Sequence, residues 1–252
     1  IKYHHYNELC GAKLDNTDIA YIVYEADNIS AALDRRERDE HYSGFDLTMP
    51  LYSVFNILND NNGNGAYELK VLKKNNKLIK LEDGKILIND SGRYSQVRDE
   101  MIASLSKMGK TMSPNALLRV LELCCTFVPS STKQNEQADI SLYNHLKTTA
   151  MIATNIYDYY NSIGINDYKK MLYNEVEISR NTNIHLLLKA DISGIQNFIY
   201  NIPNEDALKN LRARSFYLEL LTENIADLLL KTLDLTRANL IYSGGGAFQM
   251  LV

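Results

Sequence analysis

An aspartate at the end of an apolar run is the residue best suited to chemistry. The run His185–Ala190 is typical of a buried strand and leads into Asp191, Ser193 and Gly194 within the segment KADISGIQNF. This order places a carboxylate and free backbone N–H groups at one edge of a sheet. Phosphate oxygens accept from N–H donors and cations take carboxylate oxygen, so the segment suits a metal-bound triphosphate. The spacing fits equally well a strand-to-loop turn capped by the Asp and Ser side chains.

Three consecutive glycines form a second candidate, in the segment SGGGAF at residues 243–248. Glycine loses more backbone freedom on folding than any other residue, so a run of three needs a reason. A tight hairpin needs one or two of them. The third indicates that a flat or bulky group approaches the backbone closely. Alone, the run also fits a plain turn.

Histidine and aspartate side chains at three places could hold divalent metals. His4 and His5 stand near the start, Asp27 ends the stretch Tyr-Glu-Ala-Asp, and His145 opens the pattern H-x-x-x-x-A-x-x-A. Imidazoles and carboxylates that converge on divalent metals activate water against a phosphodiester. Each residue also has a structural explanation: surface histidines near the start, a helix-face carboxylate for Asp27, and a buried, hydrogen-bonded His145.

The elements that must position Asp191 and the glycines alternate in a recognisable order. They are a strand at 185–190, a helix from 203–206 to about Leu233, a strand at 239–242, a tight turn at 243–246 and a strand at 247–252. This order is the first half of a ferredoxin-like βαββαβ sheet. We therefore expect an α+β protein whose residues 177–252 form an incomplete domain of that kind.

Helical patterns dominate residues 1–176, which we expect to form a helical domain. Apolar residues recur at helical spacing in 17–38, 97–127 and 139–160. Ser113-Pro114 is a typical helix start, and Asp34–Glu40 is a charge run that we expect to be solvated.

A β-rich insertion is predicted at about 42–98. Alternating runs at 68–72, 78–81 and 86–88 predict its short strands.

Composition sets outer bounds. The chain has 252 residues, 45% hydrophobic and 23% charged, which is typical of a globular protein with a real core. A net charge of −4 argues against uniform coating of nucleic acid, although a local basic groove is compatible with it. No apolar run approaches the ~18–20 residues of a membrane span, and no signal-peptide pattern is present. Three cysteines form no disulfide framework or C-x-x-C pair, so we expect a cytoplasmic location. Because the first residue is not Met, we expect the natural chain to begin further upstream.

The two candidate segments together resemble one known family. A-D-I-S-G-I-Q-x-F-I and S-G-G-G-A-F, joined by a helix with Arg-Ala-Arg-Ser at 212–215, look like the first palm domain of the large catalytic subunit of type III-A (Csm) CRISPR effector complexes. That palm is similar in fold to nucleotide cyclases and GGDEF diguanylate cyclases. The family joins an HD domain to two palm domains, and the second palm is absent from this chain.

The resemblance implies a nucleotide site. Its residues would be Asp191, Ile192, Ser193 and Gly194 at the first strand, Arg214 and Ser215 on the helix, and Ser243, Gly244, Gly245 and Gly246 at the hairpin. Catalytic palms carry Gly-Gly-Asp-Asp in the hairpin, whose carboxylates hold two metal ions. Gly246 and Ala247 stand at those Asp positions. The palm is therefore expected to bind one ATP without supplying catalytic residues.

The N-terminal part resembles a circularly permuted HD phosphohydrolase domain, in which the aspartate helix precedes the His145 helix. This implies a divalent transition metal with His5, Asp27 and His145 as ligands or their neighbours. The consecutive His-Asp pair that names the domain does not occur in this sequence. In the permuted family that pair would lie upstream of Ile1.

The resemblance implies two activities for the intact protein when a guide RNA pairs with target RNA. One is synthesis of cyclic oligoadenylate from ATP with Mg²⁺ or Mn²⁺, and the other is metal-dependent cleavage of single-stranded DNA. The expected partners are guide RNA, target RNA, single-stranded DNA and the other Csm subunits, with no membrane. This chain alone is expected to be inactive. Two alternatives stay open: a non-catalytic scaffold subunit, and an HD–GGDEF-type signalling protein.

Overall fold

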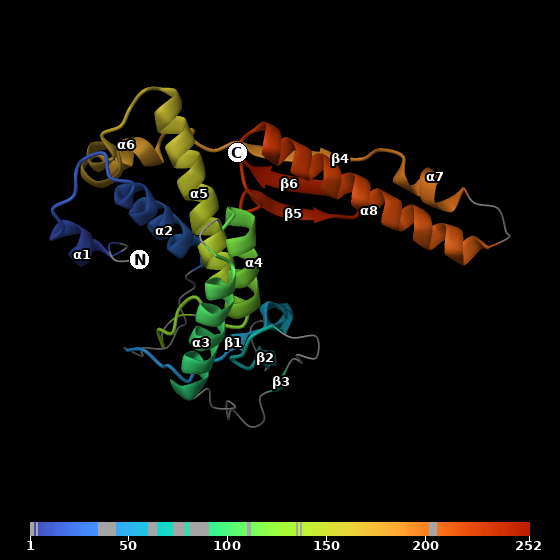
Figure 1. Cartoon of the computed structure of the whole chain (residues 1–252), viewed down its shortest axis with the longest axis horizontal. Coiled ribbons are helices and arrows are strands. Elements are labelled where there is room, and N and C mark those ends of the chain that lie inside the picture. The colour runs from blue at the N-terminus through green and yellow to red at the C-terminus, as the bar shows by residue number, and fades with distance from the viewer. Residues whose placement is uncertain are drawn as a thin grey trace. The chain divides into compact units, whose positions relative to one another are not determined.

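The computed structural model describes residues 3, 5–34, 44–59, 65–72, 79–80, 91–109, 112–134, 136, 138–201 and 206–252. Helices and short strands alternate along the chain, so the α+β class predicted from the sequence is confirmed (Figure 1). No helix in the described ranges is long and apolar enough to cross a membrane.

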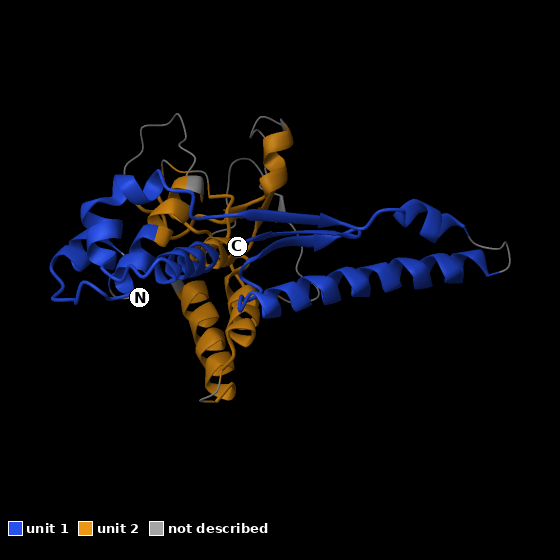
Figure 2. Cartoon of the chain, turned by 90° about the horizontal axis from the view of Figure 1, so that it is seen from above, with its two compact units in different colours: residues 1–25, 150–252 blue, residues 26–149 orange. Residues whose placement is uncertain are grey.

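Two compact units divide the chain, and they do not follow chain order. One comprises residues 1–25 and 150–252, and the other comprises residues 26–149 (Figure 2). Helices α2 (Ala20–Asp34) and α5 (Leu142–Ser162) contribute residues to both units. The division into compact units falls at 25/26 and 149/150 and does not test the domain boundary predicted at 176/177. That boundary stays a prediction.

The unit at 26–149 combines helices with a small antiparallel sheet of strand order β1-β2-β3. Besides parts of α2 and α5 it contains β1 (Leu51–Tyr52), the 3₁₀ turn η1 (Val54–Asn59), β2 (Gly65–Tyr67), β3 (Ile79–Lys80), α3 (Ser91–Lys107) and α4 (Pro114–Cys125). A buried core joins the segment after β2 to α3 and α4, comprising Leu69, Val71, Val97, Val120, Cys124, Cys125 and Val128.

The predicted β-rich insertion is right in kind and wrong in detail. The strand expected at 78–81 is present as β3. Residues 68–72 are not a strand, because Leu69 and Val71 enter the core from an irregular segment. The run 86–88 lies outside the described residues. The insertion also ends earlier than predicted, since α3 begins at Ser91.

The predicted helix start at Ser113 is confirmed. The Ser113 hydroxyl accepts a hydrogen bond from the Ala116 amide at 3.2 Å, and Pro114 occupies the first turn of α4. This cap satisfies one of the backbone donors that a helix leaves unpaired at its start.

The other unit holds the strands that carry Asp191 and the glycines. Its elements, besides parts of α2 and α5, are α1 (Tyr6–Cys10), the π-helical η2 (Lys170–Asn174), α6 (Val176–Arg180), β4 (Leu187–Asp191), α7 (Ile195–Tyr200), α8 (Ala207–Thr232), β5 (Leu240–Gly244) and β6 (Ala247–Leu251). β6 lies between β4 and β5 and is antiparallel to both (Figure 1). The predicted sequence of strand, long helix, strand, turn and strand is therefore present.

Helix α8 covers one face of this sheet. Its buried residues Leu218, Thr222, Ala226 and Leu230 follow at intervals of four, the spacing of one helical face. Ala226 and Leu230 pack against a cluster formed by Leu240, Phe248 and Met250.

The prediction that the first strand is buried was wrong. Alternate residues of β4 are exposed, and Leu187 is 58% exposed. An apolar run is typical of a strand covered on both faces, but β4 lies at an edge of the sheet of strand order β4-β6-β5, and α8 covers one face of that sheet.

Candidate functional site

The sheet brings the two predicted nucleotide segments together at one end. Asp191, the last residue of β4, pairs with Ala247, the first of β6, and Ala247 also pairs with Gly244. Just beyond, the Ile192 amide donates a hydrogen bond of 2.9 Å to the Gly246 carbonyl. The Asp-Ser-Gly loop and the glycine hairpin therefore form one continuous edge.

The strand register decides which side chains share a face. Directly opposed residues of antiparallel strands point to the same side. Ala190, Phe248 and Ser243 are aligned on the face that α8 covers. The other face, called here the open face, has two rows at this end: Asp191, Ala247 and Gly244, then Lys189, Gln249 and Tyr242. The open face therefore presents Asp191 next to two residues that have little or no side chain.

Ser243 turns its side chain away from the open face. Its hydroxyl oxygen is buried and makes no hydrogen bond of normal geometry with any described residue. It lies near Glu223 of α8, and the pKa of the Glu223 carboxyl is lowered first by this hydroxyl and then by its ion pair with Arg237. A ligand on the open face can therefore contact the backbone of Ser243 but not its hydroxyl.

Contacts within the chain account for each glycine of the hairpin. Gly245 and Gly246 form the turn with φ of +62° and +83°, the sign that a two-residue hairpin turn of this type requires at both positions. A Cβ on Gly246 would also stand 2.0 Å from Cδ1 of Ile195. A Cβ on Gly244 would stand 2.9 Å from the Tyr242 hydroxyl. The third glycine, which the sequence assigned to an approaching group, is thus explained by the chain's own tyrosine.

Backbone donors remain available at the loop, though fewer than predicted. The Ile192 amide is used by Gly246. The amides of Ser193 and Gly194 have no hydrogen-bond acceptor within the described ranges, and both residues are exposed. Gly194 has φ +78°, which favours glycine. This loop can therefore donate two amides to a phosphate and provide the Asp191 carboxylate for its cation.

The side chain of Arg214, a predicted phosphate ligand, contacts the end of α7 instead. Its guanidinium donates to the carbonyl oxygens of Phe198 and, at 2.9 Å, of Asn201, and it lies 5.3 Å from the centre of the Phe198 ring. These carbonyls lie at the end of α7, so Arg214 of α8 holds the end of the short helix that follows the Asp191–Gly194 loop. Its neighbour Ser215 is exposed. The structure therefore places Arg214 as a clamp on α7, and its predicted contact with phosphate stays a prediction.

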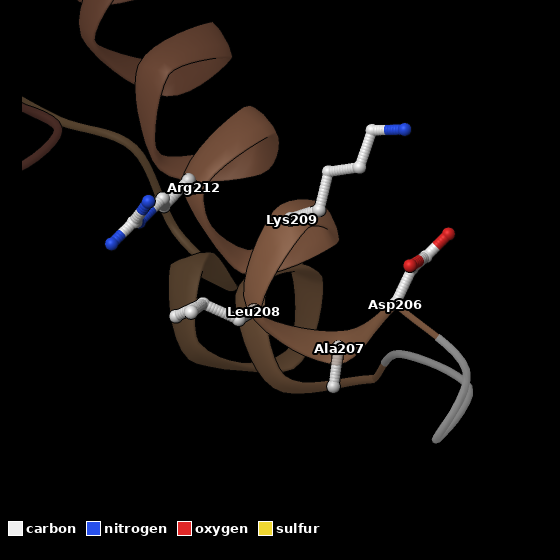
Figure 3. A pocket seen from close by; sticks show the side chains of 5 residues that line it. All are labelled: Asp206, Ala207, Leu208, Lys209 and Arg212. Atoms are coloured by element: carbon white, nitrogen blue, oxygen red, sulfur yellow. The ribbon is translucent and has the colours of Figure 1, made fainter.

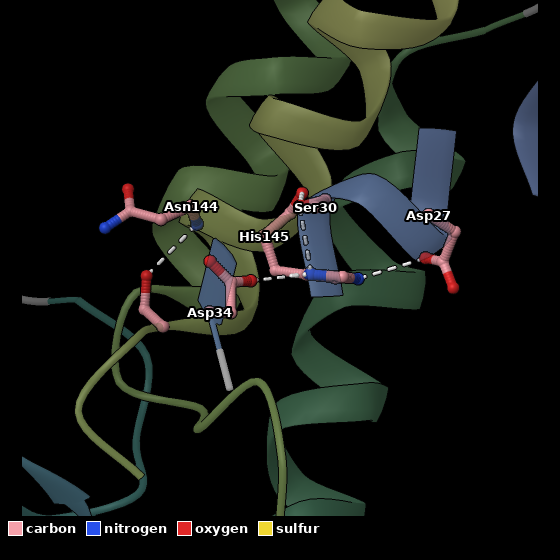
Figure 4. A network of polar contacts seen from close by, with 6 residues as sticks. Asp27, Ser30, Asp34, Asn144 and His145 are labelled. Atoms are coloured by element: carbon pink, nitrogen blue, oxygen red, sulfur yellow. Dashed lines mark hydrogen bonds and ion pairs between the residues drawn. The ribbon is translucent and has the colours of Figure 1, made fainter. Parts of the chain in front are cut away.

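His145 lies between two carboxylates of α2 (Figure 4). Its Nε2 is 3.0 Å from Oδ1 of Asp27, and its Nδ1 is 2.8 Å from Oδ2 of Asp34 and 3.2 Å from the Ser30 hydroxyl. The hydrogen bonds to Asp27 and then Asp34 raise the pKa of His145 to about 9, although burial opposes the shift. The imidazole is therefore a cation at neutral pH, with both nitrogens used as donors.

The structure brings His145 together with Asp27, as the predicted site requires, and adds Asp34, which was not among the predicted ligands. Residue 34 had been placed at the start of a solvated charge run, but its side chain is 14% exposed. The missed signal was spacing, since positions 27 and 34 are two helical turns apart on one face. His5, the third predicted ligand, is an exposed residue of the other unit, just before α1. Across the described ranges, no group of three or more His, Cys, Asp or Glu side chains has the geometry to hold a metal ion.

A shallow hollow of about 420 Å³ lies at the start of α8. The lining residues are Asp206, Ala207, Leu208, Lys209 and Arg212. Figure 3 shows Arg212 pointing to the opposite side from Lys209 and Asp206, so the three charged ends do not converge. The hollow therefore lacks converging groups that would bind a small molecule.

Known proteins resemble the chain over its whole length. Residues 184–252 match the family model of Csm1 subunit domain B. The chain is 39% identical over 264 residues to the CRISPR system single-strand-specific deoxyribonuclease Cas10/Csm1 (subtype III-A) of Enterococcus italicus. That match covers 100% of this chain and 35% of the relative. The chain thus spans about a third of the length of this relative.

Solved structures give the same picture. A Csm1–Csm4 cassette in complex with pppApA matches 94% of this chain and 28% of the solved chain, with a TM-score of 0.71 and 31% identity. A Csm1–Csm4 cassette in complex with one ATP matches 92% of this chain and 27% of the solved chain, with a TM-score of 0.66 and 31% identity.

Proposed function

Because the chain belongs to the Cas10/Csm1 family of subtype III-A CRISPR systems, we propose that residues 187–251 form half of a palm domain that binds ATP. The observation that carries the proposal is the single edge formed by the Asp191–Gly194 loop and the glycine hairpin. Two structural relatives support it, since one is a complex with ATP and the other a complex with the adenylate pppApA.

The residues at this edge fit a triphosphate and its cation. Mg²⁺ is commonly held by one or two carboxylates together with substrate phosphates, and Asp191 is exposed on the open face. When bound, Mg²⁺ or Mn²⁺ neutralises charge that develops on the phosphates. The free amides of Ser193 and Gly194 add donors for phosphate oxygens. The loop would thus hold and orient the phosphates of one nucleotide.

In the whole protein we propose synthesis of cyclic oligoadenylate. The 3′-hydroxyl of one ATP attacks the α-phosphate of a second, a phosphodiester forms, pyrophosphate leaves and the hydroxyl proton passes to solvent. Ala247 pairs directly with Asp191 and Gly246 precedes it, so the hairpin adds no carboxylate to the row. This palm would position a nucleotide, while activation would come from a palm outside these residues. The proposed trigger is target RNA paired with guide RNA in a complex with other Csm subunits.

Cleavage of single-stranded DNA, after which the relatives are named, has less support from the described residues. Both nitrogens of His145 donate to carboxylates, and a metal ion would have to displace one of these hydrogen bonds. This arrangement, with both ring nitrogens already hydrogen-bonded, does not fit a metal on His145. The proposed function therefore rests on the edge formed by the Asp191–Gly194 loop and the glycine hairpin.

The test uses the full-length parent protein assembled with guide RNA and its partner subunits. Labelled ATP with Mg²⁺ or Mn²⁺ is supplied with matching or non-matching target RNA, and the products are separated. We expect cyclic oligoadenylate only with matching RNA. Asp191→Ala should weaken ATP binding about tenfold or more, since hydrogen bonds and contacts of charged groups contribute roughly 1.5–3 kcal/mol.

Glu219→Gln is the matched control, because Glu219 is an exposed carboxylate on α8. It should bind ATP like the wild type. Absence of both product and ATP binding would overturn the proposal and favour the scaffold alternative.

A further inference from the structure

A tyrosine lies over the hairpin surface where a nucleotide is expected. Tyr242 and Gly244 are two residues apart on β5 and share the open face. The phenol lies along the strand, so that a Cβ on Gly244 would meet its hydroxyl at 2.9 Å and Cζ at 3.3 Å. The hydroxyl end of the phenol therefore lies against the bare backbone at Gly244, in space that a Cβ there would occupy.

The ring is accessible although it touches the hairpin. Tyr242 is 53% exposed, and it belongs to the open face rather than the α8 face. A half-exposed aromatic ring presents accessible surface on which a flat partner can stack. Stacking of a nucleobase on such a ring strengthens binding by roughly tenfold or more.

The position of the ring matches the size of a nucleotide. Gly244 lies two strands from Asp191 in the same row, which corresponds to about 10 Å at the usual spacing between strands. Phosphates held at Asp191, Ser193 and Gly194 would place the ribose over Ala247, whose small side chain leaves room for it. The base would then reach Tyr242.

We propose that Tyr242 is the base-stacking residue of the nucleotide site, taking an adenine whose phosphates lie at the Asp191 loop. The inference rests on the proposed function and adds the residue that binds the base. Lys189 and Gln249 share the second row of the open face with Tyr242. They lie next to the row from Asp191 to Gly244, over which the nucleotide would extend.

Substitution of the ring provides the test, with the wild-type 252-residue chain measured first. ATP and inorganic tripolyphosphate are titrated with Mg²⁺, and the dissociation constants are compared. Tyr242→Leu should weaken ATP binding about tenfold and leave tripolyphosphate binding unchanged, because only ATP has a base to stack. Asp191→Ala should weaken both ligands. Tyr200→Leu is the matched control, since Tyr200 is 69% exposed at the end of α7, and it should bind both ligands normally.

A second variant moves the ring without removing it. Gly244→Ala places a methyl group against the phenol, and the φ of Gly244 is not in the positive range, so the backbone accepts alanine. It should weaken ATP binding in the same direction as Tyr242→Leu.

Fluorescence gives an independent readout, since the chain contains no Trp. In Tyr242→Trp the single indole should be quenched by ATP and not by tripolyphosphate. If the wild type binds ATP and both Tyr242→Leu and Gly244→Ala bind it equally well, the stacking inference is overturned while the proposed function stands. If the wild type binds neither ligand, the proposed function fails first. Quenching by a single-stranded RNA oligonucleotide but not by ATP would also overturn the inference.

Discussion

At the scale of single residues, His145 gives the clearest electrostatic consequence. Its folded pKa of about 9 exceeds the ordinary value of 6.5, so the folded state binds the proton more tightly than the unfolded state. The stabilisation is therefore complete below about pH 6.5 and is lost as pH rises through 9.

We predict that the wild type loses its stability advantage over His145→Gln between pH 6.5 and pH 9. The full shift would correspond to about 3 kcal/mol, and partial exposure of the three side chains reduces the expected loss to about 1–2 kcal/mol. Urea unfolding of both proteins at pH 6, 7.5 and 9 measures it. A difference in unfolding free energy that does not change with pH would contradict the ion-pair assignment.

Several site residues could be predicted from the sequence, but the direction of their side chains could not. The motif around Asp191 and the glycine run were recognisable from residue type and spacing. That Ser243 points to the α8 face, away from Asp191, follows from strand register, which a single sequence does not reveal. Arg214 stood in the expected motif, but its contacts with α7 depend on how two helices pack.

At the scale of elements, the hairpin between β5 and β6 depends on Gly246 for two reasons. Its φ of +83° disfavours any side chain, and Cδ1 of Ile195 fills the space where a Cβ would lie. Gly245 has φ +62° but no neighbouring atom within 4 Å of a Cβ. The two glycines therefore differ in packing, although both have positive φ.

We predict that Gly246→Ala destabilises the chain by about 2–4 kcal/mol, from the left-handed backbone and from overpacking. Gly245→Ala should cost only about 1 kcal/mol, from the backbone alone. Adding Ile195→Ala to Gly246→Ala should relieve the overpacking caused by the new methyl group. Denaturant unfolding of the four proteins tests this, and equal losses at the two glycines would refute the role of Ile195.

Helices and turns with strong local signals could be predicted from the sequence, whereas the burial and strand pairing of neighbouring segments could not. Helix α8 has a regular apolar spacing and the hairpin has its glycines, so both could be found from the sequence. Burial of β4 was misjudged because an apolar run does not reveal whether one face or two are covered. The segment 68–72 alternates like a strand, yet Leu69 and Val71 reach the core from an irregular segment.

At the scale of the whole molecule, ion pairs join segments far apart in the sequence. Glu25 of α2 is 1% exposed and receives two hydrogen bonds from Arg180 of α6, at 2.7 and 3.1 Å. Both residues belong to the same compact unit, 155 positions apart. This pair ties the start of the chain to the helix that precedes β4.

We predict that Arg180→Met destabilises the chain by about 3 kcal/mol, because it leaves a buried carboxylate without its cation. The double variant Glu25→Leu with Arg180→Met should recover most of that loss, since it removes the buried charge as well. Thermal and urea unfolding provide the measurement. A double variant as unstable as Arg180→Met alone would show that packing at these positions, rather than the unpaired charge, sets the loss.

The division into two units is the feature least accessible from sequence. Helices α2 and α5 are continuous by every local signal, yet each contributes residues to both units. Local patterns along the chain do not reveal such a division, and the boundary predicted at 176/177 stays a prediction.

The contact between Gly246 and Ile195 also constrains how this hairpin can evolve. In the Gly-Gly-Asp-Asp hairpin expected of catalytic palms, an Asp would stand at the position of Gly246, but here Gly246→Asp would place a new Cβ 2.0 Å from Cδ1 of Ile195. The order of substitutions therefore matters: a carboxylate here requires Ile195 to move or to become smaller, and a smaller residue by itself leaves a cavity. Relatives that carry Asp at this position should carry a smaller residue where this chain has Ile195. A carboxylate at this position is therefore expected to depend on the residue at position 195.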